Sequence, residues 1–147
     1  ATVEALLPRL EVPDPVICHG DFHPLNVLVD TEADTGRVAV IDWTDAGIGD
    51  RHGDIARTAW LFRFAAELEP GRPRRLMLRA LAPGLARAYL SSYRRLLPAD
   101  QDRLRLWMPL HLLHAWTAAE TAGQVRLAAW AERQYRRSVV DLPASSP

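Results

Sequence analysis

A cluster of polar side chains lies between two apolar runs near the start of the sequence. The segment "ICHGDFHPLNVLVD", from Ile17 to Asp30, carries two His, one Asp and one Asn in its first ten residues. Polar groups are costly to bury, so their concentration between two strand-like runs indicates a functional site. Phosphoryl transfer from a nucleotide requires such groups: a carboxylate that accepts the proton of the attacking hydroxyl, and oxygen ligands that fix Mg²⁺ on the phosphates.

The spacing of these residues fits the protein-kinase pattern. That pattern is His-x-Asp, an Asn five residues after the Asp, and a second Asp beyond a hairpin. His19, Asp21 and Asn26 have this spacing, and Asp42 follows the run "VAVI". In this interpretation Asp21 is the catalytic base, while Asn26 and Asp42 bind the metal.

Three short runs rich in Val and Ile predict the strands that must position these side chains. They cover residues 16–18, 27–29 and 38–41. The polar stretch "DTEADTGR" between the second and third runs is typical of a hairpin loop. Asn26 precedes one strand of this hairpin and Asp42 follows the other, so we expect both residues at the same end of the sheet.

The rest of the chain predicts a Gly-rich turn followed by helices, and therefore an α+β fold. The turn is "DAGIGD", from Asp45 to Asp50. Apolar residues at helical spacing predict four helices: over 55–66, over 85–96, from Pro98 or Asp100 onward, and over 124–137. We expect Pro83 in the first turn of the second helix and a kink at Pro109 in the third. The final segment "DLPASSP" predicts a frayed tail.

Three motifs within Val16 to Ala59 carry a family resemblance. "HGDFHPLN", "IDW" and "GIGDRHGDIA" resemble the aminoglycoside phosphotransferase and choline kinase-like family, whose members share the protein-kinase fold. The resemblance implies Asp21 as catalytic base, Asn26 and Asp42 as ligands of Mg²⁺, and ATP as phosphate donor. It implies that His19 supports the catalytic loop and that Asp54, on the next helix, holds the loop's backbone.

Several polar residues keep more than one interpretation. Asp54 could instead be a simple helix N-cap. His23 could approach the phosphates of the nucleotide as a cofactor-binding residue, or could only support the loop. Cationic acceptors of this family meet acidic side chains, which makes Asp45, Asp50 and Glu120 candidates for acceptor binding, although acidic residues are usually just solvated.

A metal-dependent hydrolase is the rival hypothesis for the same stretch. His19, Asp21, His23 and Asp42, with His52 as a further candidate, could ligate Zn²⁺ or a two-metal centre. Pro24 and the lack of a role for Asn26 count against it. His111 and His114, three residues apart on an apolar helix, have a spacing compatible with metal binding, but we interpret them as core or groove histidines.

Half of a kinase is not recognisable in the sequence. Kinase chemistry requires a Gly-rich loop over the phosphates and a Lys that pairs with them. All 18 basic residues of this chain are Arg, and the roughly fifteen residues before the first strand are too few to form the lobe that carries these elements. We therefore expect residues 1–147 to form the carboxyl-terminal lobe of a kinase-like fold, a small hairpin sheet with the catalytic loop followed by a helical subdomain. The amino-terminal lobe would be absent from this chain. Alone, the lobe should show little or no activity and could self-associate through exposed apolar surface.

The composition narrows the partners and the compartment. The formal net charge is zero, which gives no electrostatic case for nucleic acid or anionic membranes. Cys18 is the single cysteine and no apolar run approaches membrane-spanning length, so a cytoplasmic location is expected. The expected substrate is a hydroxyl of an aminoglycoside-like antibiotic or a metabolite. A third hypothesis is a non-catalytic kinase-like binding module that pairs with a separate amino-terminal chain.

Overall fold

The residues that the structure describes form four helices and four short strands. The computed structural model describes residues 7–12, 14–31, 36–140 and 142. The strands are β1 (Val16–Cys18), β2 (Val27–Val29), β3 (Val38–Val40) and β4 (Gly47–Gly49); the helices are α2 (Arg51–Leu68), α3 (Arg72–Leu96), α4 (Gln101–Thr121) and α5 (Val125–Val140), with short 3₁₀ turns η1 (Leu7–Leu10) and η2 (Pro24–Asn26). The protein is thus α+β and mostly helical, as the sequence predicts.

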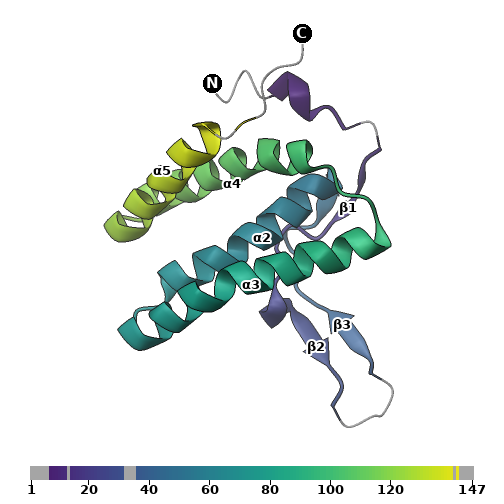
Figure 1. Cartoon of the computed structure of the whole chain (residues 1–147), viewed down its shortest axis with the longest axis horizontal. Helices are drawn as coiled ribbons and strands as arrows, with labels where there is room; N and C mark the ends of the chain where they lie inside the picture. Colours follow the sequence, from purple (N-terminus) through teal and green to yellow (C-terminus); the bar gives the residue numbers. More distant parts are fainter. Residues whose placement is uncertain (1–6, 13, 32–35, 141, 143–147) are drawn as a thin grey trace.

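The predicted hairpin is confirmed. Strands β2 and β3 pair antiparallel, with Val27 opposite Val40. Beyond this pair, the backbone N–H of Ile41 donates to the carbonyl oxygen of Asn26 at 3.0 Å. Asn26 and Asp42 therefore lie at the same end of the hairpin, which projects away from the helices in Figure 1. Residues 32–35 of the connecting loop lie outside the described residues.

The segment predicted as a Gly-rich turn contains a strand, so that prediction is wrong in part. Residues Gly47–Gly49 form β4, which pairs antiparallel with β1 and places Ile48 opposite Ile17. Glycine has a low strand propensity, and the pairing partner is distant in the sequence, so no local pattern could indicate this strand. The β1–β4 pair brings the segment after β1 against the start of α2.

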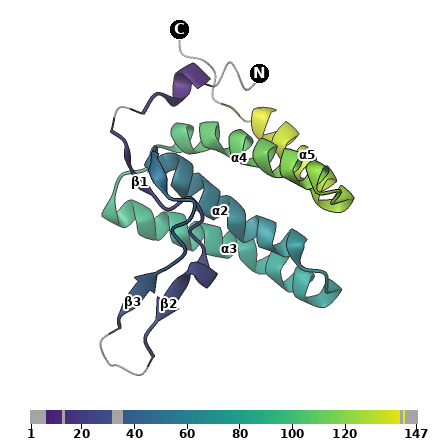
Figure 2. The same ribbon diagram turned by 180° about the vertical axis from the view of Figure 1, so that it is seen from behind.

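Helix α2 is the centre of the helical part. It packs beside α3 on one side and against α4 on the other, while α5 covers α4 (Figures 1 and 2). The core clusters are Ile55, Ala56 and Leu104; Trp60, Leu112, Ala115 and Ala131; and Ala119, Leu127 and Ala128. Because alanine is frequent in these clusters, the helices approach closely and hold the first turns of α2 in a fixed place.

The helix boundaries differ from the predictions mainly at proline. Helix α3 begins at Arg72, so Pro83 lies in its interior and not in its first turn. Asp100 caps α4 as predicted, and α4 continues as one helix through the buried Pro109. The predicted tail lies outside the described residues, apart from Leu142. Among the described helices, none has the length and apolar content required to cross a membrane.

Candidate active site

The segment from His19 to Asn26, called here the His19–Asn26 loop, is held by a carboxylate of α2. Asp54 accepts hydrogen bonds from the backbone N–H of His19 through Oδ2 at 3.0 Å and of Gly20 through Oδ1 at 2.8 Å. Asp50 is the N-cap of α2, so the cap interpretation of Asp54 does not hold. Asp54 instead fixes the start of the loop from one helical turn away.

Gly20 allows the loop to approach its neighbour closely. Its φ of +81° lies in the left-handed region, which glycine adopts without the steric cost of a side chain. A Cβ atom at this position would overlap the carbonyl oxygen of Asp45. The loop and the turn before β4 therefore pack backbone against backbone, next to Asp21.

His19 ties the loop to the strand that leads to Asp42. The side chain is only 5% exposed, and its Nε2 lies 2.9 Å from the carbonyl oxygen of Ile41. Nδ1 accepts from the backbone N–H of Asp21 at 3.3 Å, so Nε2 must carry the proton and donate it to Ile41. The ring also packs on Trp43, with ring centroids 4.6 Å apart. Both ring nitrogens are used, which favours loop support over direct chemistry for His19.

Asp21 presents a partly exposed carboxylate between two basic side chains. Its Oδ2 lies 3.3 Å from Nε2 of His23, and its Oδ1 lies 3.5 Å from a terminal nitrogen of Arg57. The same nitrogen of Arg57 lies 3.6 Å from Oδ2 of Asp45. Arg57 was not among the residues predicted for the site from the sequence. Arg57 follows Asp54 by three residues, so the two side chains share one face of the helix, and this spacing could have indicated that Arg57 lies near the loop.

Asn26 and Asp42 place an amide oxygen and a carboxylate at one end of the hairpin. Asn26 is buried, and its amide Nδ2 donates to the carbonyl oxygen of Asp21 at 2.9 Å. Its Oδ1 is therefore the atom suited to a cation. Asp42 has a φ of +60°, a conformation that Asp tolerates better than most residues, and accepts from the Thr44 hydroxyl at 2.7 Å. An amide oxygen and a carboxylate fit a hard cation such as Mg²⁺.

Two of the five donors proposed for a hydrolase, His19 and His52, are engaged in hydrogen bonds within the protein. Neither ring nitrogen of His19 is open to a metal, as shown above. His52 has Nδ1 at 2.8 Å from Oδ1 of Asp50, and its Nε2 accepts from the backbone N–H of Asp100 at 3.1 Å. Over the described residues, no three or more His, Cys, Asp or Glu side chains are placed to share a metal ion. The arrangement therefore does not favour a zinc or two-metal hydrolase.

Asp50 belongs to a buried structural cluster, which does not support its candidacy for acceptor binding. The residue is 7% exposed, and its carboxylate accepts from Arg103, from Trp107 Nε1 at 2.8 Å and from the His52 N–H at 2.9 Å. Burial alone would raise the pKa of the Asp50 carboxyl, but the donors on Trp107, His52 and Arg103 outweigh burial and hold the pKa well below its usual range. Asp50 thus joins α2 to α4.

The other two acidic candidates are separated in space. Asp45 has a side chain that is 60% exposed and lies beside Arg57, next to the His19–Asn26 loop. Glu120 lies in the last turn of α4, roughly 14 Å along the helix from His111 at about 1.5 Å per residue. His111 is the residue by which α4 contacts the start of α2. The structure therefore gathers Asp45 with the loop and leaves Glu120 apart from it.

His111 packs between α4 and the start of α2, and its side chain has a hydrogen-bond partner there. Its Nε2 donates to the carbonyl oxygen of Gly53 at 2.8 Å, and its ring stacks on Trp107 with centroids 5.8 Å apart. Burial lowers the pKa of His111 to about 4, so the ring is neutral near pH 7. These contacts agree with the interpretation of His111 as a packing residue.

The depressed pKa of His111 predicts a loss of stability in mild acid. The unfolded chain binds the proton near pH 6.5 and the folded chain only near pH 4. The free energy of unfolding should therefore fall as the pH drops from about 6.5 to about 4, by on the order of 3 kcal/mol. Urea denaturation at several pH values should show this slope in the wild type and in the exposed control His114→Gln. A His111→Gln variant that keeps the full slope would contradict the assignment.

Known proteins resemble this chain over part of its length. The model of the family described as "Phosphotransferase enzyme family" matches residues 1–107. An aminoglycoside 3'-phosphotransferase of Streptomyces fradiae is 52% identical over 52 residues, which are 35% of this chain and 19% of that protein. The chain thus aligns with about a fifth of the length of that relative. No solved structure matches the chain.

Proposed function

Since the chain belongs to the phosphotransferase enzyme family, we propose that it is the catalytic-loop and helical lobe of a kinase-like enzyme. The proposed reaction transfers the γ-phosphate of ATP to a hydroxyl of a small molecule in the cytoplasm. The observation that carries the proposal is the meeting of Asp21, Asn26 and Asp42 around one loop and one hairpin end, where Asn26 binds the backbone of Asp21.

In this proposal Asp21 acts as the general base. Its carboxylate is partly exposed and can accept the proton of the attacking hydroxyl. His23 and Arg57 contact its two oxygens, so they orient the carboxylate. His23 also remains a candidate for contact with the nucleotide phosphates, since it lies on the same loop.

Asn26 and Asp42 would hold Mg²⁺ through Oδ1 and the carboxylate. When bound, Mg²⁺ neutralises charge on the phosphates of ATP. The chain's own contribution is placement: His19 connects the loop to the residue before Asp42, and Asp54 fixes the loop's first two amides. The loop and the metal pair are in this way held by one hydrogen-bonded unit.

We propose a cationic, hydroxyl-bearing acceptor close to Asp45. The relative from Streptomyces fradiae is an aminoglycoside 3'-phosphotransferase, and aminoglycosides are cationic molecules that carry hydroxyl groups. The exposed Asp45 carboxylate lies beside Arg57, which also contacts Asp21, so an acceptor amine there would place a hydroxyl near the base. Because the sequence contains no Lys, we propose that a nucleotide-clamping lobe outside these residues pairs with the α- and β-phosphates.

Thermal unfolding with metal and nucleotide tests the proposal. Millimolar Mg²⁺ plus ATP should raise the Tm of the wild-type chain, because ligands that bind only the folded state stabilise it. Both Asn26→Ala and Asp42→Asn should abolish this rise, and the exposed control Asp102→Asn should retain it. A rise with Zn²⁺ that survives Asn26→Ala would instead favour the hydrolase and contradict the proposed metal pair.

A further inference from the structure

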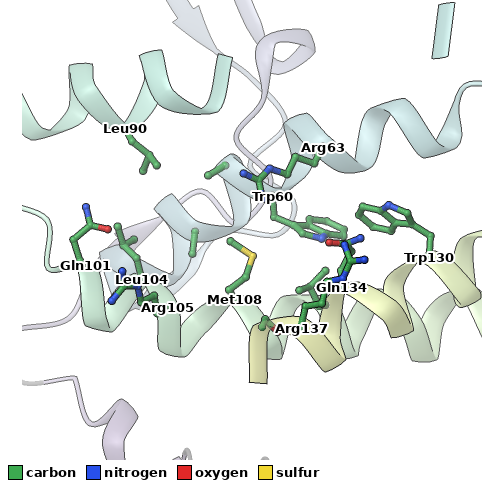
Figure 3. Close-up of a pocket in the computed structure, with 14 residues that line it drawn as sticks. Trp60, Arg63, Leu90, Gln101, Leu104, Arg105, Met108, Trp130, Gln134 and Arg137 are labelled. Atoms are coloured by element: carbon green, nitrogen blue, oxygen red, sulfur yellow. The ribbon is translucent and has the colours of Figure 1, made fainter. Parts of the chain in front are cut away.

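A cavity of about 400 Å³ lies between α2, α4 and α5, with Leu90 of α3 at its edge (Figure 3). This volume is in the range of small-molecule sites. All its lining residues come from the four helices, and none belongs to the His19–Asn26 loop or to the hairpin. The cavity is thus a second concave feature, on a face of α2 different from the one that carries Asp54 and Arg57.

The cavity combines an apolar aromatic wall with basic residues. Figure 3 shows Trp60, Trp130, Gln134 and Arg137 grouped at one end, and Gln101, Leu104 and Arg105 at the other, with Met108 between them. The lining includes Arg63, Arg105 and Arg137 but neither Asp nor Glu. Within the part of the chain that the structure describes, Arg105 pairs with Asp102, whereas Arg63 and Arg137 have no ion pair.

An unsatisfied donor lies in the same wall. Trp60 is 7% exposed, and its indole Nε1 is buried and, among the described residues, has no hydrogen-bond acceptor. An indole N–H can only donate, and an unmade hydrogen bond of a buried group is costly. The atom is buried in this structure, so an oxygen atom of a bound molecule would satisfy it only once the side chains around it shift to admit the ligand.

We propose that this cavity binds a small carboxylate with an aromatic body. The aromatic ring would pack against Trp130 and Met108, which are apolar and partly buried. One carboxylate oxygen would accept from Trp60 Nε1, and the guanidinium groups of Arg63 and Arg137 would balance the charge; planar guanidinium groups suit planar carboxylates. The arginines would repel the cationic acceptor of the proposed phosphoryl transfer, so the cavity is not the acceptor site. The carboxylate site therefore does not depend on the proposed function.

Titration of the whole chain with 2-naphthoate tests the proposal, with neutral 2-naphthamide as the matched ligand. Each of the five Trp residues contributes one indole N–H signal to the ¹H–¹⁵N NMR spectrum, and Trp60→Phe identifies the signal of Trp60. We expect a saturable downfield shift of the Trp60 signal, and at least about tenfold tighter binding of the carboxylate than of the amide. Equal affinities, or a saturable response that leaves Trp60 unmoved, would overturn the proposal, as would shifts of all five signals without saturation.

Variants of the rim separate a built site from general apolar binding. Arg63 and Arg137 are exposed, so Arg63→Gln and Arg137→Gln should fold normally and should each weaken naphthoate binding by about tenfold. Arg133→Gln, an exposed residue of α5 outside the cavity, should leave the affinity unchanged. Unchanged affinity in both rim variants would overturn the proposal. The Tm rise with MgATP should persist in the rim variants, so a failure here is distinguishable from a failure of the phosphotransferase proposal.

Discussion

Asp21→Asn is expected to reduce phosphoryl transfer by about 10³-fold while MgATP binding persists. Asn has nearly the same shape as Asp but cannot accept a proton at neutral pH, so the attacking hydroxyl would lose its base. The metal pair, Asn26 and Asp42, would remain, because Asn26 binds the backbone carbonyl of residue 21 and not its side chain. The transfer of labelled γ-phosphate to an aminoglycoside, in a protein that includes the proposed nucleotide-clamping lobe, measures the loss.

The control for this prediction is Asp102→Asn, which removes an exposed carboxylate of α4. This variant should keep the wild-type rate. Loss of the Asp21 contacts with His23 and Arg57 should cost less than about 1 kcal/mol of stability, because these contacts are long and partly exposed. If Asp21→Asn retains more than a tenth of the wild-type rate, Asp21 is not the general base. A wild type that binds MgATP without any transfer would instead be a non-catalytic binding module.

The sequence predicted that Asn26 and Asp42 lie at one end of the hairpin because that geometry is local. Three Val- and Ile-rich runs and one polar loop define a hairpin, and a hairpin brings the residue before one strand to the residue after the other. The hydrogen bond from Ile41 to Asn26 is the contact this logic requires. The support of the loop by Asp54 also followed, because the motif resemblance implied it and the structure shows two hydrogen bonds to the loop's backbone.

The features that the sequence did not predict depend on contacts between distant segments. Strand β4 has one non-glycine residue, Ile48, and forms only because β1 supplies a partner. Arg57 has an ordinary position on a helix until the loop places Asp21 against it. The acceptor candidacy of Asp50 failed for the same reason. Its partners Arg103 and Trp107 lie on α4, and the sequence pattern near residue 50 cannot predict contacts with a helix so distant in the chain.

Asp50→Ala is expected to cause the largest loss of stability, about 3–5 kcal/mol, because it breaks a buried ion pair by removing one partner. Arg103 donates to Asp50 through Nε at 3.0 Å and through a terminal nitrogen at 2.6 Å, and it would be left without this carboxylate. Trp107 Nε1 and the backbone N–H of His52 would lose their acceptor as well. Urea denaturation at pH 7 measures the loss, and Asp102→Ala, an exposed acid of α4, should change stability by less than about 1 kcal/mol.

The pH dependence distinguishes this cluster from His111. The pKa of Asp50 is lower in the folded chain than its unfolded value of about 3.9, because the hydrogen-bond donors outweigh burial. Its contribution is therefore complete above about pH 4 and is lost as the pH falls further through the folded pKa. The slope due to His111 lies at higher pH, between about 6.5 and 4. Asp50→Asn should flatten the profile only below pH 4 and keep the slope above it; a profile parallel to the wild type below pH 4 would show that Asp50 is not the buried anion joining α2 to α4.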